Sequence, residues 1–159
     1  MSRLLIIGGT RFLGYFITQA ALDRGHEMTL FNRGQSAPGT FPHVEHICGD
    51  RDADIGLLAG RQWDSVIDTS GYFPRIVGKS AQLLAGSVPH YVFVSSISAY
   101  AEPLPDTSDE DAPLQSLEDP TVEEVRGDTY GGLKALCEQA VQEAYPGRAL
   151  IVRPTLIVG

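Results

Sequence analysis

Six short apolar runs, set apart by segments long enough to cross over a sheet, limit the fold of this chain more than any other feature. Consecutive apolar positions are typical of parallel strands buried on both faces, and parallel strands need crossover connections. The pattern predicts an α/β fold built on a doubly wound parallel sheet with helices on both faces. The predicted strands are Arg3–Ile7, Glu27–Asn32, Val44–Cys48, Ser65–Thr69, His90–Ser95 and Ala149–Val152.

The connecting segments carry helix signals and loop signals. Glycine directly after a helical pattern marks its end, as at Gly25 and Gly60, and Pro74 is placed as a first-turn proline. Proline and glycine indicate a loop at Gln35–Pro42, and residues 101–128 form a longer polar loop with four prolines and many acidic residues. The predicted helices are Phe12–Arg24, Asp52–Ala59, Pro74–Leu84 and Tyr130–Ala144.

Composition limits the classes of protein that the chain can represent. It has 159 residues, 43% of them hydrophobic, which is enough for one domain with a buried core. Its net charge of −8 disfavours a nucleic-acid or membrane surface. It lacks the roughly 18-residue apolar stretch needed to span a bilayer, and its first residues lack a signal-peptide pattern. Cys48 and Cys137 form neither a disulfide framework nor a metal pattern, so we expect a reducing, cytoplasmic location and no bound metal.

A glycine-rich turn joins the first predicted strand to the first predicted helix. Gly8 allows the chain to turn tightly, Gly14 allows the helix to pack close to the sheet, and the helix N-terminus presents free N–H groups to a pyrophosphate. A tight turn without a ligand is the alternative. The residues predicted to bind a dinucleotide here are Gly8, Gly9, Thr10, Arg11, Phe12, Leu13 and Gly14.

Basic residues stand where a nicotinamide dinucleotide would present its adenosine ribose. Arg11 lies in the turn, and the second predicted strand ends at Asn32 and Arg33, without the acidic residue that usually binds the ribose hydroxyls of NAD. Arginine pairs bidentately with phosphate, so these residues favour NADP, with its 2′-phosphate, over NAD. The alternative role for Arg33 is a solvated charge in a loop.

Tyr130 and Lys134 lie one helical turn apart on the same face of the last predicted helix. A phenol has an ordinary pKa of about 10, and a nearby ammonium favours the phenolate and lowers that pKa. Tyr130 could then take a proton from a substrate hydroxyl, or give one to a carbonyl, while hydride moves to or from a nicotinamide. A serine at the end of the fifth predicted strand could hold the same substrate oxygen, and the candidates are Ser95, Ser96 and Ser98.

These motifs together resemble the extended short-chain dehydrogenase/reductase family of NAD(P)-dependent epimerases and dehydratases, whose members have a Rossmann fold. The family's turn has three glycines, which align with positions 8, 11 and 14 of this chain. Gly8 and Gly14 follow that pattern, and Arg11 departs from it. The form GGTRFLG resembles an atypical branch that includes the chloroplast stem-loop-binding proteins. The resemblance extends over the whole chain but only over the cofactor half of a typical member. Residues 1–159 are therefore expected to form an NAD(P)-binding domain without the C-terminal substrate lobe.

The resemblance also implies roles for individual residues. Asp50 would hydrogen-bond the adenine amino group, with Arg51 beside it, although capping of the next helix is an equal alternative for Asp50. Thr69 and Ser70 would lie next to the cofactor ribose. Tyr130 and Lys134 would both bind the cofactor, and Lys134 would hydrogen-bond the nicotinamide ribose. The implied catalytic residues are Ser96, Tyr130 and Lys134.

The implied function is hydride transfer by an epimerase or a reductase, with a nucleotide sugar or a similar small hydroxy or carbonyl compound as substrate. Dehydration is disfavoured, because Ile97 and Ser98 stand where the family's dehydratases carry an Asp-Glu pair. The alternatives are an RNA-binding protein like the chloroplast relatives and a cofactor-sensing regulator without chemistry. The resemblance is also consistent with a homodimer formed through Pro74–Leu84 and Tyr130–Ala144.

Overall fold

The computed structural model describes residues 1–158 and contains one sheet of six parallel strands in the order β3-β2-β1-β4-β5-β6. From β1 to β3 the strands follow one another toward one edge of the sheet, and from β4 to β6 toward the other, so the strand order reverses between β1 and β4. This is the strand order of the Rossmann fold, and it confirms the predicted doubly wound sheet. The strands are β1 Arg3–Ile7, β2 Glu27–Asn32, β3 Glu45–Cys48, β4 Ser65–Asp68, β5 His90–Val94 and β6 Ala149–Val152.

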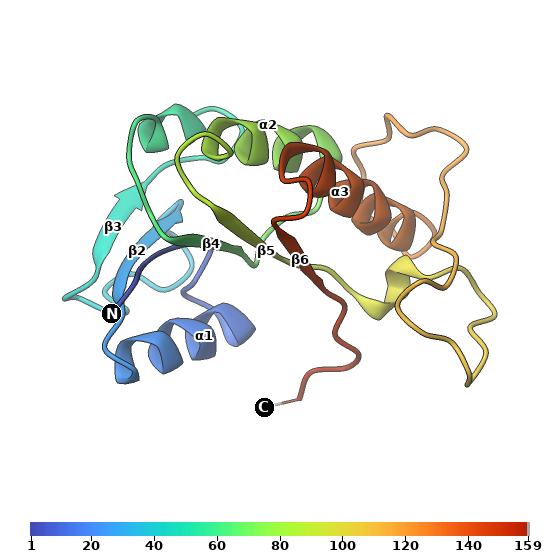
Figure 1. Ribbon diagram of the computed structural model, residues 1–159, viewed down its shortest axis with the longest axis horizontal. Helices are drawn as coiled ribbons and strands as arrows, with labels where there is room; N and C mark the ends of the chain where they lie inside the picture. The colour runs from blue at the N-terminus through green and yellow to red at the C-terminus, as the bar shows by residue number, and fades with distance from the viewer. Residues whose placement is uncertain (159) are drawn as a thin grey trace.

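Helices cover both faces of the sheet, as predicted (Figure 1). The helix α1, Phe12–Asp23, lies on one face, and α2, Pro74–Leu84, packs against α3, Tyr130–Ala144, on the other. Two short 3₁₀ turns complete the fold: η1 at Ile55–Leu58 and η2 at Ile97–Ala99. All of these helices within residues 1–158 fall short of the length and apolarity that crossing a bilayer requires.

The predicted helix at Asp52–Ala59 is wrong, because only the single 3₁₀ turn η1 forms there. The aspartates before it bind the backbone of their own loop instead. The Asp54 carboxylate accepts a hydrogen bond from the Asp50 N–H at 2.8 Å, and the Asp50 carboxylate accepts one from the Asp52 N–H at 2.8 Å. Such local bonds compete with helix formation. The other predicted elements agree with the structure to within one residue at each end.

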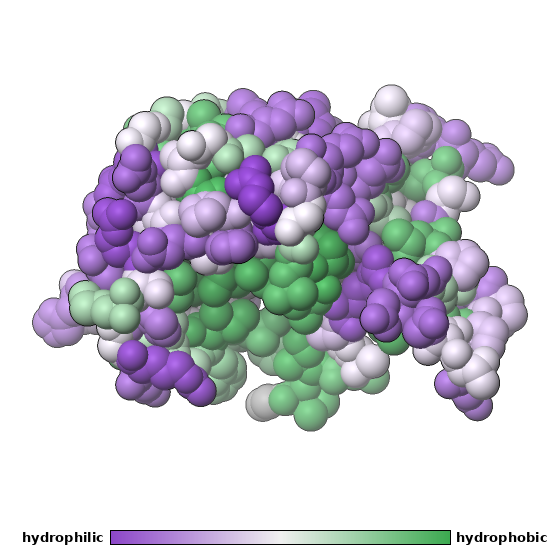
Figure 2. Space-filling view, viewed as in Figure 1, coloured by the Kyte–Doolittle hydropathy of each residue, from purple (hydrophilic) through white to green (hydrophobic). Residues whose placement is uncertain are grey.

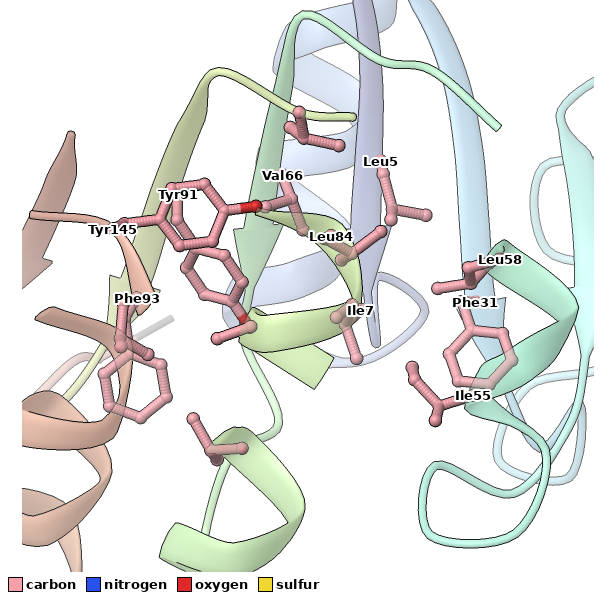
Figure 3. Packing of buried hydrophobic residues seen from close by; sticks show 14 of the residues in the cluster. Leu5, Ile7, Phe31, Ile55, Leu58, Val66, Leu84, Tyr91, Phe93 and Tyr145 are labelled. Atoms are coloured by element: carbon pink, nitrogen blue, oxygen red, sulfur yellow. The ribbon is translucent and has the colours of Figure 1, made fainter. Parts of the chain in front are cut away.

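Alternate side chains of the strands enter two separate cores. Leu5, Ile7 and Phe93 point into the larger core beneath α2, α3 and η1, together with Tyr91 and Phe31 (Figure 3). The smaller core lies under α1 and contains Ile6, Ala21, Met28 and Leu30. Burial on both sides explains why β1 is apolar at every position after Arg3.

Within residues 1–158, the sheet face that carries α1 is exposed at β6. Ala149 and Ile151 of β6 pack against the larger core, so Leu150 and Val152 point to the opposite side, where 59% and 39% of their surfaces are exposed. Figure 2 shows apolar side chains gathered over β6 and the segment that follows it, which includes the exposed Leu156 and Val158.

Candidate functional site

A cavity of about 730 Å³ opens at the carboxyl ends of β1, β2, β3 and β4. In a doubly wound sheet this edge, where the strand order reverses, is the usual ligand site. The cavity brings together residues 7–14, 31–36 and 49–52 with residues between 69 and 76, which include the start of α2. Its lining includes every residue that the sequence predicted to bind a dinucleotide, apart from Tyr130 and Lys134: Gly8, Gly9, Thr10, Arg11, Phe12, Leu13, Gly14, Asn32, Arg33, Asp50, Arg51, Thr69 and Ser70.

The glycine turn forms the floor of this cavity. Gly8 and Gly9 have φ values of 108° and 89°, in the region that side chains disfavour. A Cβ at Gly14 would lie 3.0 Å from the Gly9 nitrogen, so only glycine lets α1 start this close to the turn. No side chain caps this end of α1, which leaves first-turn N–H groups for a ligand. The close-fitting glycines and the uncapped helix end fit a pyrophosphate, and the cavity therefore fits a dinucleotide.

Asn32 joins the end of β2 to the glycine turn. Its Nδ2 donates to the Gly8 carbonyl at 2.8 Å, and its Oδ1 accepts from the Gly34 N–H at 2.8 Å. An ionised aspartate at this position could not donate to that carbonyl. Arg11 and Arg33 are exposed on the rim of the same cavity, so the rim carries two cations, and the tip of β2 carries no carboxylate.

The end of β4 holds the opposite wall through bonds to β1. The Thr69 and Ser70 hydroxyls both donate to the Ile7 carbonyl, at 3.0 and 3.3 Å. Both hydroxyls therefore bond within the protein, and these small side chains leave space in the cavity beside the end of β4. Asp50 accepts bonds from the N–H groups of Asp52 and Ala53 in its own loop, so it caps no helix, because the helix considered for it does not form.

Lys134 is buried at the same edge of the sheet, between β4 and β5. Its Nζ donates to the carbonyls of Gly71 and Val94, each at 2.8 Å, and lies 4.2 Å from the centre of the Phe93 ring. Burial is the main reason that the pKa of this lysine is lowered from its ordinary value. The Nζ also lies 5.7 Å from the ring centre of Tyr72, which lines the cavity, so Tyr72 connects the cavity to Lys134.

Tyr130 is the half-buried first residue of α3, and the glycines after it let this end of the helix pack tightly. A Cβ on Gly131 would collide with the Ser98 carbonyl of η2, and one on Gly132 would lie 2.6 Å from the Leu117 side chain. The glycines therefore set the start of α3 directly against η2 and the polar loop. Ser96, Tyr130 and Lys134 are not part of the cavity lining within residues 1–158.

The serines after β5 have different surroundings. The buried Ser95 hydroxyl donates to the Glu138 carboxylate of α3, so it is held inside the fold. The Ser96 hydroxyl is half-exposed and accepts a bond from the Ser98 N–H at 3.2 Å, which starts η2. Within residues 1–158, neither the Ser96 hydroxyl nor the Ser98 hydroxyl donates to a protein group, whereas the Ser95 hydroxyl does.

Two buried ion pairs support this edge and were missed in the sequence. Arg51 pairs with Asp68 at the end of β4, and Arg153 pairs with Glu138 in α3. A signal was present for each pair, because Asp68 interrupts an apolar strand and Glu138 falls one turn after Lys134 on a helix face that is buried. A buried carboxylate requires a partner.

Curated proteins share 32% identity with parts of this chain. No family model matches the chain. Over 114 residues it is 32% identical to the chloroplast stem-loop binding protein of 41 kDa b of Arabidopsis thaliana, a match to 62% of this chain and 30% of that protein. Over 81 residues it is 32% identical to a 3 beta-hydroxysteroid dehydrogenase/Delta 5-->4-isomerase of Mycobacterium tuberculosis, covering 50% of this chain and 22% of that protein.

Solved structures match the chain over nearly its whole length. The Bordetella bronchiseptica enzyme WbmG, in complex with NAD and UDP, has a TM-score of 0.76 at 18% identity, with 99% of this chain and 56% of that chain covered. A UDP-galactose 4-epimerase has a TM-score of 0.71 at 20% identity, with 95% and 55% covered. The chain spans about half the length of these structures, and its matches span less than a third of the curated relatives.

The sheet order, with a glycine turn between β1 and α1, defines a Rossmann-type α/β fold. Within that class, the glycine turn and the Tyr130 and Lys134 pair predicted a resemblance to the extended short-chain dehydrogenase/reductases. The 32% identity to a hydroxysteroid dehydrogenase bears out this resemblance, and the solved epimerases share the fold.

Proposed function

We propose that this chain is the NAD(P)-binding part of an extended short-chain dehydrogenase/reductase enzyme. The observation that carries the proposal is the position of Lys134, one turn after Tyr130, buried at the same sheet edge as the dinucleotide cavity. The relatives support the reaction class, since they include an epimerase of UDP-galactose and a structure with both NAD and UDP bound. The proposed substrate is a nucleotide sugar or a similar small hydroxy or carbonyl compound.

The proposed chemistry divides among three side chains. A bound nicotinamide dinucleotide would supply the acceptor or donor of hydride. The Tyr130 phenol would take a proton from the substrate hydroxyl or return one to a carbonyl, and the Lys134 ammonium would favour the phenolate that does so. Ser96 would donate its free hydroxyl proton to the substrate oxygen. The two carbonyls bonded to Lys134 would keep its charge at this edge of the sheet.

The proposed cofactor is NADP, and NAD is the alternative. Arg11 and Arg33 on the cavity rim can pair with a 2′-phosphate, and the tip of β2 presents Asn32 in place of an acidic residue. The dinucleotides in the WbmG and WbmH structures are NAD and NAD+, so the preference has to be measured on this chain.

Calorimetric titration with NADP⁺ and NAD⁺ tests the cofactor proposal. In the Arg33→Ala variant, the affinity for NADP⁺ should fall by about tenfold or more, because a charged hydrogen-bonded pair contributes roughly 1.5–3 kcal/mol, and the affinity for NAD⁺ should not change. Arg24→Ala is the matched control, since Arg24 is exposed at the other end of α1. Equal loss for both dinucleotides would contradict a 2′-phosphate site, and no binding of either by the wild type would contradict the proposed function.

RNA binding is the second candidate function, favoured by the similarity to the chloroplast stem-loop binding protein. The net charge of −8 opposes it, because affinity for nucleic acid arises largely from basic side chains on phosphates. Fluorescence anisotropy with a labelled stem-loop RNA at two salt concentrations tests it. Binding that weakens steeply with salt would favour this second function, and an unchanged signal at micromolar protein would exclude it.

Other expectations remain predictions. They are an NAD(P)-binding domain without the C-terminal substrate lobe, a cytoplasmic location and a homodimer. For a dimer through α2 and α3, the exposed positions of these helices are largely polar: Arg75, Lys79, Gln82, Gln139, Gln142 and Glu143.

A further inference from the structure

Arg51 and Asp68 form a buried, bidentate ion pair underneath the dinucleotide cavity. The Arg51 Nη1 donates to Asp68 Oδ1 at 2.9 Å, and Nη2 donates to Oδ2. The Arg51 side chain is 12% exposed and the Asp68 side chain is fully buried. The pair joins the loop after β3 to the end of β4, which are not neighbours in the sheet because β2 and β1 lie between them.

Neighbouring polar groups complete the pair. The Arg51 Nε donates to the Ser80 hydroxyl of α2 at 2.9 Å, and the Tyr91 hydroxyl of β5 donates to Asp68 Oδ2 at 2.8 Å. All three guanidinium nitrogens of Arg51 thus donate to protein acceptors. The side chain is therefore held by the protein, although the residue lines the cavity and the sequence predicted it to bind the cofactor.

Each end of the pair fixes a wall of the cavity. Arg51 lies between Asp50 and Asp52, all three of which line the cavity. The Asp68 Oδ1 also accepts from the Ser70 N–H at 3.1 Å, and Ser70 lines the facing wall. One rigid contact therefore sets the spacing between the loop after β3 and the end of β4.

We propose that Arg51 is a positioning residue that acts through Asp68: their ion pair holds the two walls at the spacing that a dinucleotide requires. The inference rests on the proposed function of the cavity. A buried ion pair adds little net stability compared with apolar residues of similar volume, but its planar, two-bond geometry restricts direction and distance in a way that apolar contact does not. The pair should thus matter more for affinity than for folding.

A comparison of single and double variants separates positioning from stability. Arg51→Met alone leaves Asp68 buried without its cation, so we expect a lower melting temperature. The double variant Arg51→Met, Asp68→Leu removes both charges and should recover most of that melting temperature. In the proposal, this double variant still binds NADP⁺ about tenfold or more weakly than the wild type, measured by calorimetry. A double variant that melts and binds like the wild type would overturn it.

Two further measurements keep the test decisive. Arg51→Lys retains the charge but loses the two-bond geometry, so a folded Arg51→Lys protein should also bind NADP⁺ more weakly, and wild-type affinity there would overturn the proposal even if the double variant does not fold. Hydrogen exchange without ligand should be faster at residues 49–52 and 69–70 in the folded variants and unchanged in α3. Failure of the wild type to bind any dinucleotide would contradict the proposed function instead, and the exchange pattern would still report on the two walls.

Discussion

Glu138, in the middle of α3, and Arg153, the residue after β6, form a largely buried ion pair. The Arg153 Nη2 lies 2.7 Å from Glu138 Oε2, and the Glu138 side chain is 1% exposed. Arg153 also donates to the Tyr100 hydroxyl at 2.7 Å and to the Glu110 carbonyl at 2.9 Å. The pair therefore ties α3 and β6 to the polar loop that precedes Tyr130.

Replacing Arg153 with methionine should destabilise the fold strongly. Glu138 would remain buried with only the Ser95 hydroxyl as a side-chain partner, and removing one member of a buried pair costs about 3–5 kcal/mol. Urea unfolding followed by circular dichroism measures the change in the free energy of unfolding. Arg24→Met is the control at an exposed site, where we expect less than about 0.5 kcal/mol. A similar small loss in Arg153→Met would mean that the pair does not support the fold.

Gly14→Ala should weaken both the fold and dinucleotide binding. The new methyl group would lie 3.0 Å from the Gly9 nitrogen and 3.1 Å from its Cα, so α1 would have to move away from the turn. Overpacking of this kind costs about 1–3 kcal/mol. Thermal unfolding and calorimetric titration with NADP⁺ measure the two effects. Gly56→Ala is the matched control, because a Cβ there meets nothing within 4 Å. Unchanged NADP⁺ affinity in Gly14→Ala would contradict the role of the turn.

The two thiols should differ in reactivity. Cys137 is buried in α3, and burial is the main reason that its pKa is raised to about 12, so at pH 8 almost none of it is the reactive thiolate. Cys48 is exposed. A disulfide reagent that releases a coloured thiolate should therefore titrate one thiol in the folded protein and both after denaturation. Cys48→Ser should abolish the fast phase, and a fast phase that survives would show that α3 opens readily.

Strand positions were predictable because each strand holds apolar residues between turn or loop signals. The structure shifts the predicted strand ends by at most one residue. The helix predicted at Asp52–Ala59 failed for a local reason, since aspartate side chains there bond the backbone that a helix would need. The sequence did not identify these bonds, because whether a side chain caps a turn or faces a ligand depends on the neighbouring strands.

The candidate site was also predictable only in part. The spacing of Tyr130 and Lys134 already placed both on one helix face, but the carbonyls that receive Lys134 belong to residues after β4 and at the end of β5. These groups meet only once the strand order is known. The partner of Asp68 was likewise hidden, because Arg51 reaches it across two intervening strands.

Acid should weaken the fold partly through Arg75. This exposed arginine hydrogen-bonds Asp52 and Glu123, and these bonds lower the pKa of both carboxyl groups. A carboxyl whose folded pKa is depressed adds stability above its unfolded pKa, about 4 to 4.5, and loses it as the pH falls through the folded value. Between about pH 6 and about pH 3, Arg75→Ala should therefore lose less stability than the wild type, measured by urea unfolding at each pH. The difference should shrink in high salt, because exposed pairs are screened. Parallel pH profiles in low salt would contradict the contribution of these pairs.

Tyr130→Phe should slow turnover far more than it weakens dinucleotide binding. The change removes only the hydroxyl of a half-buried residue at the start of α3, and a positioned proton donor or acceptor accounts for about 10²–10⁴ in rate. The assay is proton NMR of UDP-galactose and UDP-N-acetylglucosamine incubated with the protein and dinucleotide, with reduction of the dinucleotide followed by absorbance. Tyr15→Phe is the control, because Tyr15 is an exposed tyrosine of α1 that stacks on Phe41 away from Lys134. Turnover in the wild type that Tyr130→Phe alone removes would support the enzyme over a cofactor-sensing regulator. Equal rates in the two variants would exclude the phenol from the chemistry, since no other group is changed.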